Sequence, residues 1–302
     1  MTVSAFSGRV LVVGAAGRLG GCVVETFADR DVVVHTRASL DITDPAAVRR
    51  AVEQARPAVV INCAAFNRVD EAEDRPLDAL AVNALAVRSL ARAAESVGAA
   101  LVHYGSDFVF DGTAAEPYDE AAQPAPRSAY AVSKLLGDWL ALDAPRGFVL
   151  RVESLFGASL TWPGRGGSVD TILDGLEQGR AVRVFTDRVV SPSYVEDVAR
   201  ATRHLLDAGA APGLYHVVNS GSATWRELAE EAARLMDVPA RLEPVSVDAV
   251  SLKAVRPRFC ALSNRKLADA GFPMPSWTDA LRRWVEARSL RARHATIDRI
   301  HG

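Results

Sequence analysis

The chain has 302 residues, 24% of them charged, and a formal net charge of -2 at pH 7. This near balance, without a long block of one sign, excludes the charge pattern of a nucleic-acid-binding protein and favours a small-molecule partner. No apolar run approaches the roughly 20 residues that a membrane span needs. The N-terminus has no basic segment of the kind that opens a signal peptide, so we expect a cytoplasmic protein.

Three cysteines, Cys22, Cys63 and Cys260, lie far apart and form no CxxC pair. This spacing argues against a disulfide framework and against a zinc site. We therefore expect a reducing compartment and no metal.

Apolar runs alternate with helical patterns through the first half of the chain. Strands are predicted at 10–13, 32–35, 58–62, 101–104 and 148–152, and helices at 19–28, 45–54, 77–97 and 128–142. Such alternation builds a parallel sheet with helices on both faces. The expected fold class is therefore α/β, a doubly wound parallel-sheet Rossmann domain.

The alternation of predicted strands and helices becomes irregular after residue 152, where we expect a smaller substrate-binding lobe. Helices are predicted at 169–178, 193–206, 225–236 and 278–287, and strands at 183–185 and 214–218. The expected division is 1–152 for dinucleotide binding and 153–287 mainly for substrate, with segments near 186–220 returning to the first domain. Residues 288–302 lack apolar periodicity and predict a loose tail or an oligomer contact. Trp139, Trp277 and Trp284 fit helix-core positions.

A glycine motif, Gly14-Ala-Ala-Gly-Arg-Leu-Gly20, follows the first predicted strand directly and opens a helix. In that context Gly14 allows a tight turn, Gly17 lets the backbone approach a pyrophosphate, and Gly20 brings helix and strand together. The helix N-terminus, with Arg18 and Leu19, would then face the phosphates. The motif predicts a dinucleotide site, with an ordinary strand-turn-helix as the alternative.

The second predicted strand ends without the acidic residue that commonly holds the ribose of NAD. Arg37 stands there instead, and a guanidinium suits the 2'-phosphate of NADPH, with Arg18 as a second candidate. A solvated Arg37 is the alternative, so NADH stays open. Asp41 and Ile42 would border the adenine.

Tyr130 and Lys134 are four residues apart on one predicted helix, and Ser106 precedes them by 24 positions. A lysine ammonium beside a tyrosine lowers the phenol pKa from about 10, which lets the phenol exchange protons with a carbonyl oxygen near neutral pH. A serine hydroxyl can hold the same oxygen. By itself the spacing also fits a tyrosine packed on an amphipathic helix.

Several further blocks occur in the order of one known family. They are Leu40-Asp-Ile-Thr-Asp44, Val59-Val-Ile-Asn-Cys-Ala-Ala65, Val69-Asp-Glu-Ala-Glu73, Gly105-Ser-Asp-Phe-Val-Phe-Asp-Gly112 and Ser191-Pro-Ser-Tyr194. Together with the glycine motif and the Tyr130/Lys134 pair, they resemble the extended short-chain dehydrogenase/reductases and, within them, the dTDP-4-dehydrorhamnose reductases. The resemblance covers nearly the whole chain.

The resemblance implies that Ser106, Tyr130 and Lys134 are catalytic. NADPH would deliver hydride to the C4 ketone of a nucleotide-linked, dTDP-type deoxysugar, Tyr130 would supply the proton, and Ser106 would bind the oxygen. Other positions that the resemblance assigns to the cofactor are Cys63, Ala64, Ala65 and Asn83. Asn83 fits helix packing equally well.

Asp107 and Phe108 would face the sugar, although Asp107 could instead anchor its own turn. Family members typically read Arg-Thr-Ser-Trp after the sixth strand, whereas this chain reads Arg151-Val-Glu-Ser154. Glu153 then becomes a candidate acceptor for sugar hydroxyls, or a salt-bridge partner of Arg151 or Arg188. Arg256 would grip a diphosphate, or lie in a solvated loop.

Two other functions remain open: a nucleotide-sugar epimerase or dehydratase of the same fold, and a non-catalytic NADP-binding regulatory subunit. The sequence shows no further acid/base pair beside Ser106, which disfavours dehydration. The intact Ser106, Tyr130 and Lys134 disfavour the regulatory subunit. The sugar, the stereochemistry at C4 and the oligomeric state stay open, with a homodimer as the expected assembly.

Overall fold

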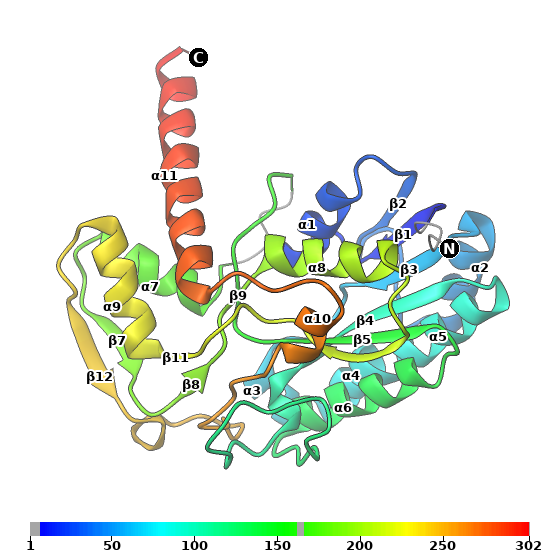
Figure 1. Cartoon of the computed structure of the whole chain (residues 1–302), viewed down its shortest axis with the longest axis horizontal. Coiled ribbons are helices and arrows are strands. Elements are labelled where there is room, and N and C mark those ends of the chain that lie inside the picture. Colours follow the sequence, from blue (N-terminus) through cyan, green and yellow to red (C-terminus); the bar gives the residue numbers. More distant parts are fainter. Residues whose placement is uncertain (1–6, 162–165, 302) are drawn as a thin grey trace.

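The structure, a computed structural model, describes residues 7–161 and 166–301, with only the backbone described from 292 onward. Its centre is a six-stranded sheet in the order β10-β5-β4-β3-β1-β2, in which all pairings are parallel (Figure 1). The strands are β1 (Val10–Val13), β2 (Val32–His35), β3 (Val59–Asn62), β4 (Ala100–Ser106), β5 (Gly147–Val152) and β10 (Gly213–His216). The expected α/β fold with a doubly wound parallel sheet is confirmed.

Helices cover both faces of this sheet, which explains why β1, β3, β4 and β5 are buried along their whole length. One face packs against α1 (Arg18–Thr26) and α8 (Val195–Asp207). The other packs against α2 (Pro45–Ala55), α5 (Ala86–Ser96) and α6 (Ala129–Leu142). Figure 1 shows these two helical layers on opposite sides of the strands.

The strand order places a switch point between β1 and β3. The chain leaves β1 toward β2 on one side and returns to β3 on the other. Connections that diverge in this way open a crevice at the carboxyl ends of the strands, where α/β proteins bind their ligands. Gly14, Cys63 and Ser106, which follow or end β1, β3 and β4, all lie at this edge.

The single helix predicted at 77–97 is interrupted. The chain forms α3 (Val69–Asp74), α4 (Pro76–Leu80), a π-helical turn η1 (Ala81–Leu85) and then α5. The π turn contains Asn83, whose side chain is buried and hydrogen-bonded. Periodicity cannot show such a turn, because one wide turn barely disturbs the apolar pattern.

A second region lies beside the sheet, formed mostly after residue 152. Its helices are α7 (Ser168–Glu177) and α9 (Trp225–Met236), whereas the short α10 (Arg265–Asp269) packs against β10 at the edge of the main sheet. Its short strand pairs are β7 (Val182–Phe185) with β12 (Leu242–Val245), β8 (Val189–Val190) with β11 (Ala223–Thr224), and β6 (Leu155–Phe156) with β9 (Ser193–Tyr194). Two 3-10 turns, η2 (Asp107–Val109) and η3 (Val247–Ala249), complete the elements apart from the last helix. One apolar core runs from the sheet into this region.

The last helix, α11 (Trp277–His301), is longer than predicted and leaves the body of the molecule in Figure 1. The expectation of a loose tail from 288 is wrong. Arg288 binds Asp174 at 2.5 Å, and Arg291 donates to the Ala158 carbonyl oxygen at 2.9 Å. Residues 288–302 include four Arg and two Ala, residue types that favour helix even without an apolar stripe.

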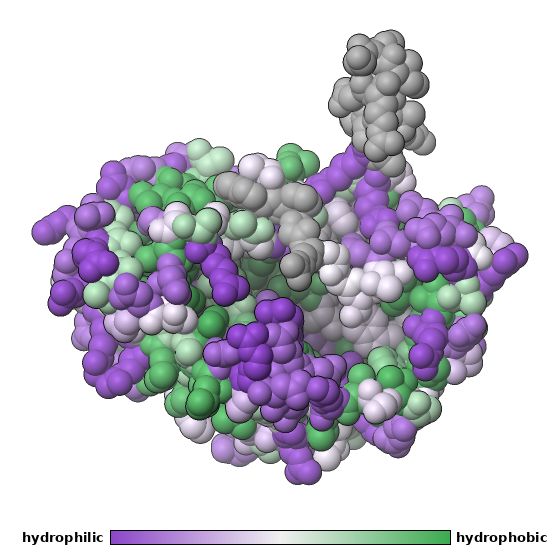
Figure 2. Space-filling model, turned by 180° about the vertical axis from the view of Figure 1, so that it is seen from behind, coloured by the Kyte–Doolittle hydropathy of each residue, from purple (hydrophilic) through white to green (hydrophobic). Residues whose placement is uncertain are grey.

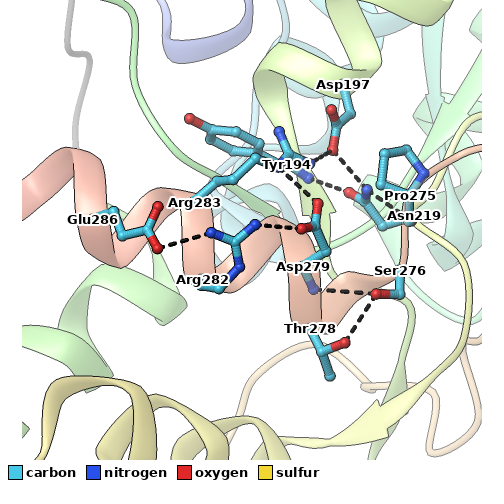
Figure 3. Close-up of polar contacts among 10 residues, drawn as sticks. All are labelled: Tyr194, Asp197, Asn219, Pro275, Ser276, Thr278, Asp279, Arg282, Arg283 and Glu286. Carbon is cyan, nitrogen blue, oxygen red and sulfur yellow. Dashed lines mark hydrogen bonds and ion pairs between the residues drawn. The ribbon is translucent and has the colours of Figure 1, made fainter.

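A buried network attaches the start of α11 to the sheet domain (Figure 3). Asp197, on α8, is almost fully buried and accepts hydrogen bonds from Arg283 at 2.6 Å and from Asn219 at 2.8 Å. The Arg283 guanidinium also lies 5.0 Å from the ring centroid of Tyr194. Burying a carboxylate this deeply costs free energy, and the hydrogen bonds from Arg283 and Asn219 offset that cost.

Trp139 does not fit the predicted core position, since 57% of the side chain is exposed on α6. Trp284 is buried as predicted. Other exposed apolar residues on α4, η1 and α6 are Leu77, Leu85, Val132 and Leu142. Figure 2 shows small apolar patches scattered among charged residues over the visible face of the molecule. In the described part of the chain, no helix has the length and apolar character of a membrane span.

Candidate active site

The glycine loop is tightly built against the end of β3. Gly14 has a φ of +75°, and a Cβ on it would lie 2.5 Å from the Ala64 backbone nitrogen. A Cβ on Gly20 would collide with the Gly14 carbonyl oxygen. Gly17 is the N-cap of α1 and donates to the Gly14 carbonyl at 3.1 Å. Only glycine lets the backbone segments of this loop approach each other so closely. The free N–H groups at the start of α1 then lie at the switch point, where they suit a pyrophosphate.

The two arginines predicted near the phosphates have different surroundings. Arg18 pairs with Asp170 of α7 at 2.6 Å and lies 3.4 Å from the Leu155 carbonyl oxygen, so it joins the glycine loop to the second region. Arg37 is exposed directly after β2. Arg37 therefore presents its guanidinium to solvent, whereas that of Arg18 is mostly buried in an ion pair.

The neighbours of Arg37 show ordered loop geometry. Asp41 accepts from the Thr43 backbone and hydroxyl, bonds that lower its pKa, with a smaller contribution from the Arg37 charge. Ile42 and Leu19 are buried in the cores on the two faces of the sheet. Asp44 caps α2 as expected from a residue before Pro45, accepting from Ala46 and Ala47.

The segment after β3 lies beside the glycine loop. Cys63 donates its backbone N–H to Val13 at 2.9 Å, and Ala64 donates to the Asn62 side chain at 3.1 Å. Ala65, like both of these, is partly exposed.

Asn83 does not face open space. Its amide bonds the Phe66 N–H and carbonyl oxygen and the Ser133 hydroxyl. It thus joins the π turn, the loop after β3 and α6, and its side chain serves the fold.

Ser106, Tyr130 and Lys134 come together as predicted. Ser106 ends β4, while Tyr130 and Lys134 lie one turn apart on α6, and all three side chains are buried. The Ser106 hydroxyl donates its hydrogen to the Asp107 carboxylate at 3.1 Å and is near enough to the Tyr130 phenol to lower its pKa. Phe108 packs edge-on against the Tyr130 ring, with 5.5 Å between the centroids.

The electrostatics differ from the expectation drawn from the spacing. Burial raises the pKa of Tyr130 above its usual value, and the neighbouring Ser106 hydroxyl only partly opposes this. The Lys134 ammonium donates to the Tyr104 carbonyl at 2.5 Å, and burial lowers its pKa to about 8. The expected lowering of the phenol pKa by Lys134 is not found: Lys134 is not among the groups that shift the pKa of Tyr130, and desolvation sets its direction.

A buried polar network of residues from α6, β4 and β5 lies next to Lys134. Asp138, one turn further along α6, accepts from Arg151 of β5 at 2.9 Å, and its charge favours the protonated form of Lys134. His103 of β4 lies 3.9 Å from Asp138, but burial holds its pKa well below the usual value, so it is neutral. His103 is therefore a neutral residue of the buried core.

On the other side of Tyr130 two arginines lie over one aromatic ring. The guanidinium carbons of Arg188 and Arg256 are 6.0 Å and 5.8 Å from the Phe108 ring centroid. Arg256 also forms an ion pair with Asp70 of α3 at 2.8 Å. The alternative prediction, that Arg256 is a solvated loop residue, is therefore wrong. Cations and an aromatic face beside a reactive centre suit an anionic, ring-containing ligand.

Glu153 lies beside Asp107, so the expectation of no acid/base pair next to Ser106 is wrong. Atoms of Asp107, Glu153 and Cys260 lie within 4.8 Å of one another, and all three residues are buried. Burial raises the pKa of Glu153 well above its usual range and that of Asp107 to about 6, while the Arg188 charge opposes both shifts. Glu153 accepts from the Ser191 N–H at 2.7 Å, and Arg151 pairs with Asp138 instead.

Sequence reasoning missed Asp138 and Cys260 as neighbours of the site, whereas Arg188 was considered as a partner of Glu153, and its charge does act on Glu153. Asp138 had a signal, because Tyr130, Lys134 and Asp138 are spaced by four on one helix. Cys260 had none, since it comes from a loop far away in the sequence. Ser154 was noted only as a departure from the family, but it has a φ of +45°, a strained value for serine, at the point where β5 leads into β6.

Comparison with known proteins agrees with this geometry. Residues 8–289 match the family model of the RmlD substrate binding domain. The chain is 39% identical to a dTDP-4-dehydrorhamnose reductase of Streptomyces griseus, over 90% of this chain and 91% of that protein. It is 37% identical to a dTDP-4-keto-6-deoxy-D-glucose reductase of Streptomyces niveus, over 90% and 95%.

A solved structure is similar along the same length. The dTDP-4-dehydrorhamnose reductase of Bacillus anthracis, determined in complex with NADP, superposes with a TM-score of 0.86 at 32% identity. The match covers 92% of this chain and 98% of that one. The chain therefore belongs to the dTDP-4-dehydrorhamnose reductase family of the extended short-chain dehydrogenase/reductases.

Proposed function

We propose that this protein is an NADPH-dependent reductase of the C4 ketone of a dTDP-linked deoxysugar. One observation carries the proposal: the buried side chains of Ser106, Tyr130 and Lys134 lie at the same sheet edge as the glycine loop. Two relatives, a dTDP-4-dehydrorhamnose reductase and a dTDP-4-keto-6-deoxy-D-glucose reductase, support the same reaction and the same class of substrate.

Each of the three residues then has a distinct role. When bound, NADPH supplies the hydride. Tyr130 donates its phenolic proton to the carbonyl oxygen as charge develops there, and Ser106 holds that oxygen by a hydrogen bond. Lys134 stays charged up to about pH 8, where it attracts the developing phenolate. The high pKa of Tyr130 keeps the phenol protonated and ready to act as an acid.

The cofactor fits the residues at the switch point. The cradle made by Gly14, Gly17 and Gly20 admits backbone but no side chain, as a pyrophosphate site requires. Arg37, exposed after β2, is our candidate for the 2'-phosphate, and Asp41 and Ile42 would border the adenine. Other proposed cofactor residues are Arg18, Leu19, Cys63, Ala64, Ala65 and Asn83, of which Asn83 acts by holding the loop after β3.

The substrate would lie between the sheet and the second region. Phe108, Asp107 and Glu153 would border the sugar, and Arg256 would face the diphosphate. We assign residues 1–152 to the cofactor and 153–287 mainly to the substrate, with the β10 segment belonging to the first domain because it extends the sheet.

The decisive experiment is NADPH oxidation measured against a panel of nucleotide-linked 4-keto sugars. Oxidation that depends on one of them supports a reductase. Conversion of a nucleotide sugar without net NADPH consumption would indicate the epimerase or dehydratase alternative, in which the cofactor is oxidised and reduced in one cycle. NADPH binding without any conversion would indicate a regulatory subunit.

We further propose a cytoplasmic homodimer. Its three cysteines are free, which fits a reducing compartment. Val132 and Trp139 are seven residues apart on α6 and so share one exposed face, next to Leu77 and Leu85. Trp139→Arg should lower the mass seen by sedimentation; an unchanged mass would contradict this interface.

A further inference from the structure

The glycine loop contacts the second region through the side chain of Arg18. Arg18 is the first residue of α1, and its Nη2 donates to the Asp170 carboxylate of α7 at 2.6 Å. Its Nη1 donates to the carbonyl oxygen of Leu155, in β6, at 3.4 Å. One arginine therefore joins the segment that we propose for the pyrophosphate to two elements of the second region.

Asp170 is held in place by further contacts. The Oδ2 atom that accepts from Arg18 also accepts from the Gly167 N–H, just before α7, at 2.9 Å. Its Oδ1 accepts from the indole N–H of Trp284, in α11, at 3.2 Å, and the Arg288 guanidinium lies 3.7 Å from the same oxygen. The carboxylate thus fixes the start of α7 relative to the glycine loop.

The ion pair between Arg18 and Asp170 is largely buried, with side chains that are 11% and 10% exposed. Separating a buried pair leaves two uncompensated charges in surroundings that solvate them poorly, which is strongly unfavourable. The glycine loop and the start of α7 are therefore held as one unit. A ligand that fixes either of them restricts the other.

Another face of α7 lines a cavity of about 360 Å³ in the second region. The lining residues of the helix, Ser168, Thr171, Ile172 and Gly175, are three or four positions apart and share one face, whereas Asp170 lies on the opposite one. Residues of β7 line the same cavity. The helix therefore forms a wall of this cavity while its opposite face holds the glycine loop.

The cavity lies next to the catalytic side of the molecule through Arg188. Arg188 lines the cavity, and its guanidinium carbon lies 6.0 Å from the ring centroid of Phe108, which packs against Tyr130. Trp225 also lines it, and its buried indole N–H has no hydrogen-bond partner among the described residues. These donors suit the acceptor oxygens of an anionic ligand, so binding of a nucleotide sugar here would fix α7.

We propose that Arg18 is a positioning residue that couples two binding events: with Asp170, it makes NADPH and the nucleotide sugar each raise the affinity for the other. This inference rests on the proposed function and deepens it. The physical cause is the shared free-energy cost of holding the glycine loop and α7 in place. The first ligand meets this cost, and the second ligand binds to a site that is already fixed.

Two ligands that do not react with each other test the coupling without turnover. Isothermal titration calorimetry gives the Kd of dTDP with and without saturating NADP⁺, and the Kd of NADP⁺ with and without saturating dTDP. In the unchanged protein each ligand should tighten the binding of the other at least about fivefold, by the same factor in both directions. In Arg18→Gln this factor should fall below about twofold.

The factor separates coupling from direct contact. If Arg18 only contacted a cofactor phosphate, Arg18→Gln would weaken NADP⁺ binding equally with and without dTDP. The factor would then stay unchanged, and the proposal would be overturned. Asp170→Asn removes the ion pair from the other side, while its amide oxygen can still accept from Gly167. It should lose the factor in the same way, and a retained factor would contradict the proposal.

Arg288→Gln is the matched control. It removes another arginine from the surroundings of Asp170 but leaves the contact between the glycine loop and α7, so the factor should persist. Its loss there too would show general loosening of the second region and overturn the role of Arg18. If both ligands bind the unchanged protein independently, the coupling is wrong while the proposed function stands. If dTDP does not bind at all, the proposed class of substrate fails, and the coupling with it.

Discussion

The cofactor half and the substrate half of the site are built in different ways. At the glycine loop the shape is made by backbone, and the participating segments directly follow β1 and β3. On the substrate side the cluster around Phe108 and Glu153 is made by side chains from η2, from the residue after β5 and from two distant loops. The shape of a site made by backbone depends on glycines at a fixed spacing. The shape of a site made by side chains depends on how loops pack, so the substrate half can change the ligand that it accepts more easily than the cofactor half.

Tyr130 stands between the two halves, and its loss should have the largest effect. Tyr130→Phe removes the proton donor while keeping the ring that packs on Phe108. We expect kcat to fall by about a hundredfold to ten-thousandfold. NADPH affinity, measured by fluorescence titration, should stay almost unchanged. Full activity in this variant would contradict the proposed chemistry.

Arg37 tests the cofactor half alone. Arg37→Ala removes the exposed guanidinium proposed for the 2'-phosphate, so NADPH binding should weaken about tenfold more than NADH binding. Arg50→Ala, another exposed arginine, on α2, serves as the control and should change neither affinity. Equal losses for both cofactors in Arg37→Ala would place the phosphate elsewhere.

Lys134 is a buried residue of α6 between the cofactor half and the substrate half of the site. Its titration should make the stability of the protein depend on pH. Its pKa is about 8 in the fold, against about 10.4 in the unfolded chain. Between these values the unfolded state binds more protons, so stability rises with pH. The unfolding constant measured in urea should fall roughly twentyfold between about pH 7.5 and about pH 9.5. Lys134→Met should lack this rise; the same rise in both proteins would assign it to another group.

Ser154 tests the substrate half and should give the smallest effect. Ser154→Gly relieves the positive φ and should stabilise the protein by about 1 kcal/mol or less, with NADPH affinity unchanged. Ser154→Val should destabilise it, since a β-branched side chain fits this conformation worse. Denaturant midpoints would show the order Gly, Ser, Val, and a reversed order would mean that side-chain contacts outweigh the strain.

The elements that position the cofactor were predictable because local patterns define them. Short apolar runs predicted β1, β2 and β3, and the helical pattern at 45–54 predicted α2. The π turn at Asn83, the exposed Trp139 and the full length of α11 were not predicted. In each case the deciding contact or its absence lies between elements, and periodicity along one helix carries no such information.

The sequence by itself determined the family, the parallel sheet, the glycine loop and the association of Ser106 with Tyr130 and Lys134. These depend on spacing within one element or at the end of one strand. Only the tertiary structure decided which charges surround them: that Lys134 points at a carbonyl, that Arg18 binds Asp170, and that Glu153 meets Asp107. Burial and long-range packing set these electrostatics, because desolvation and charge pairing depend on residues that the chain brings together only when folded.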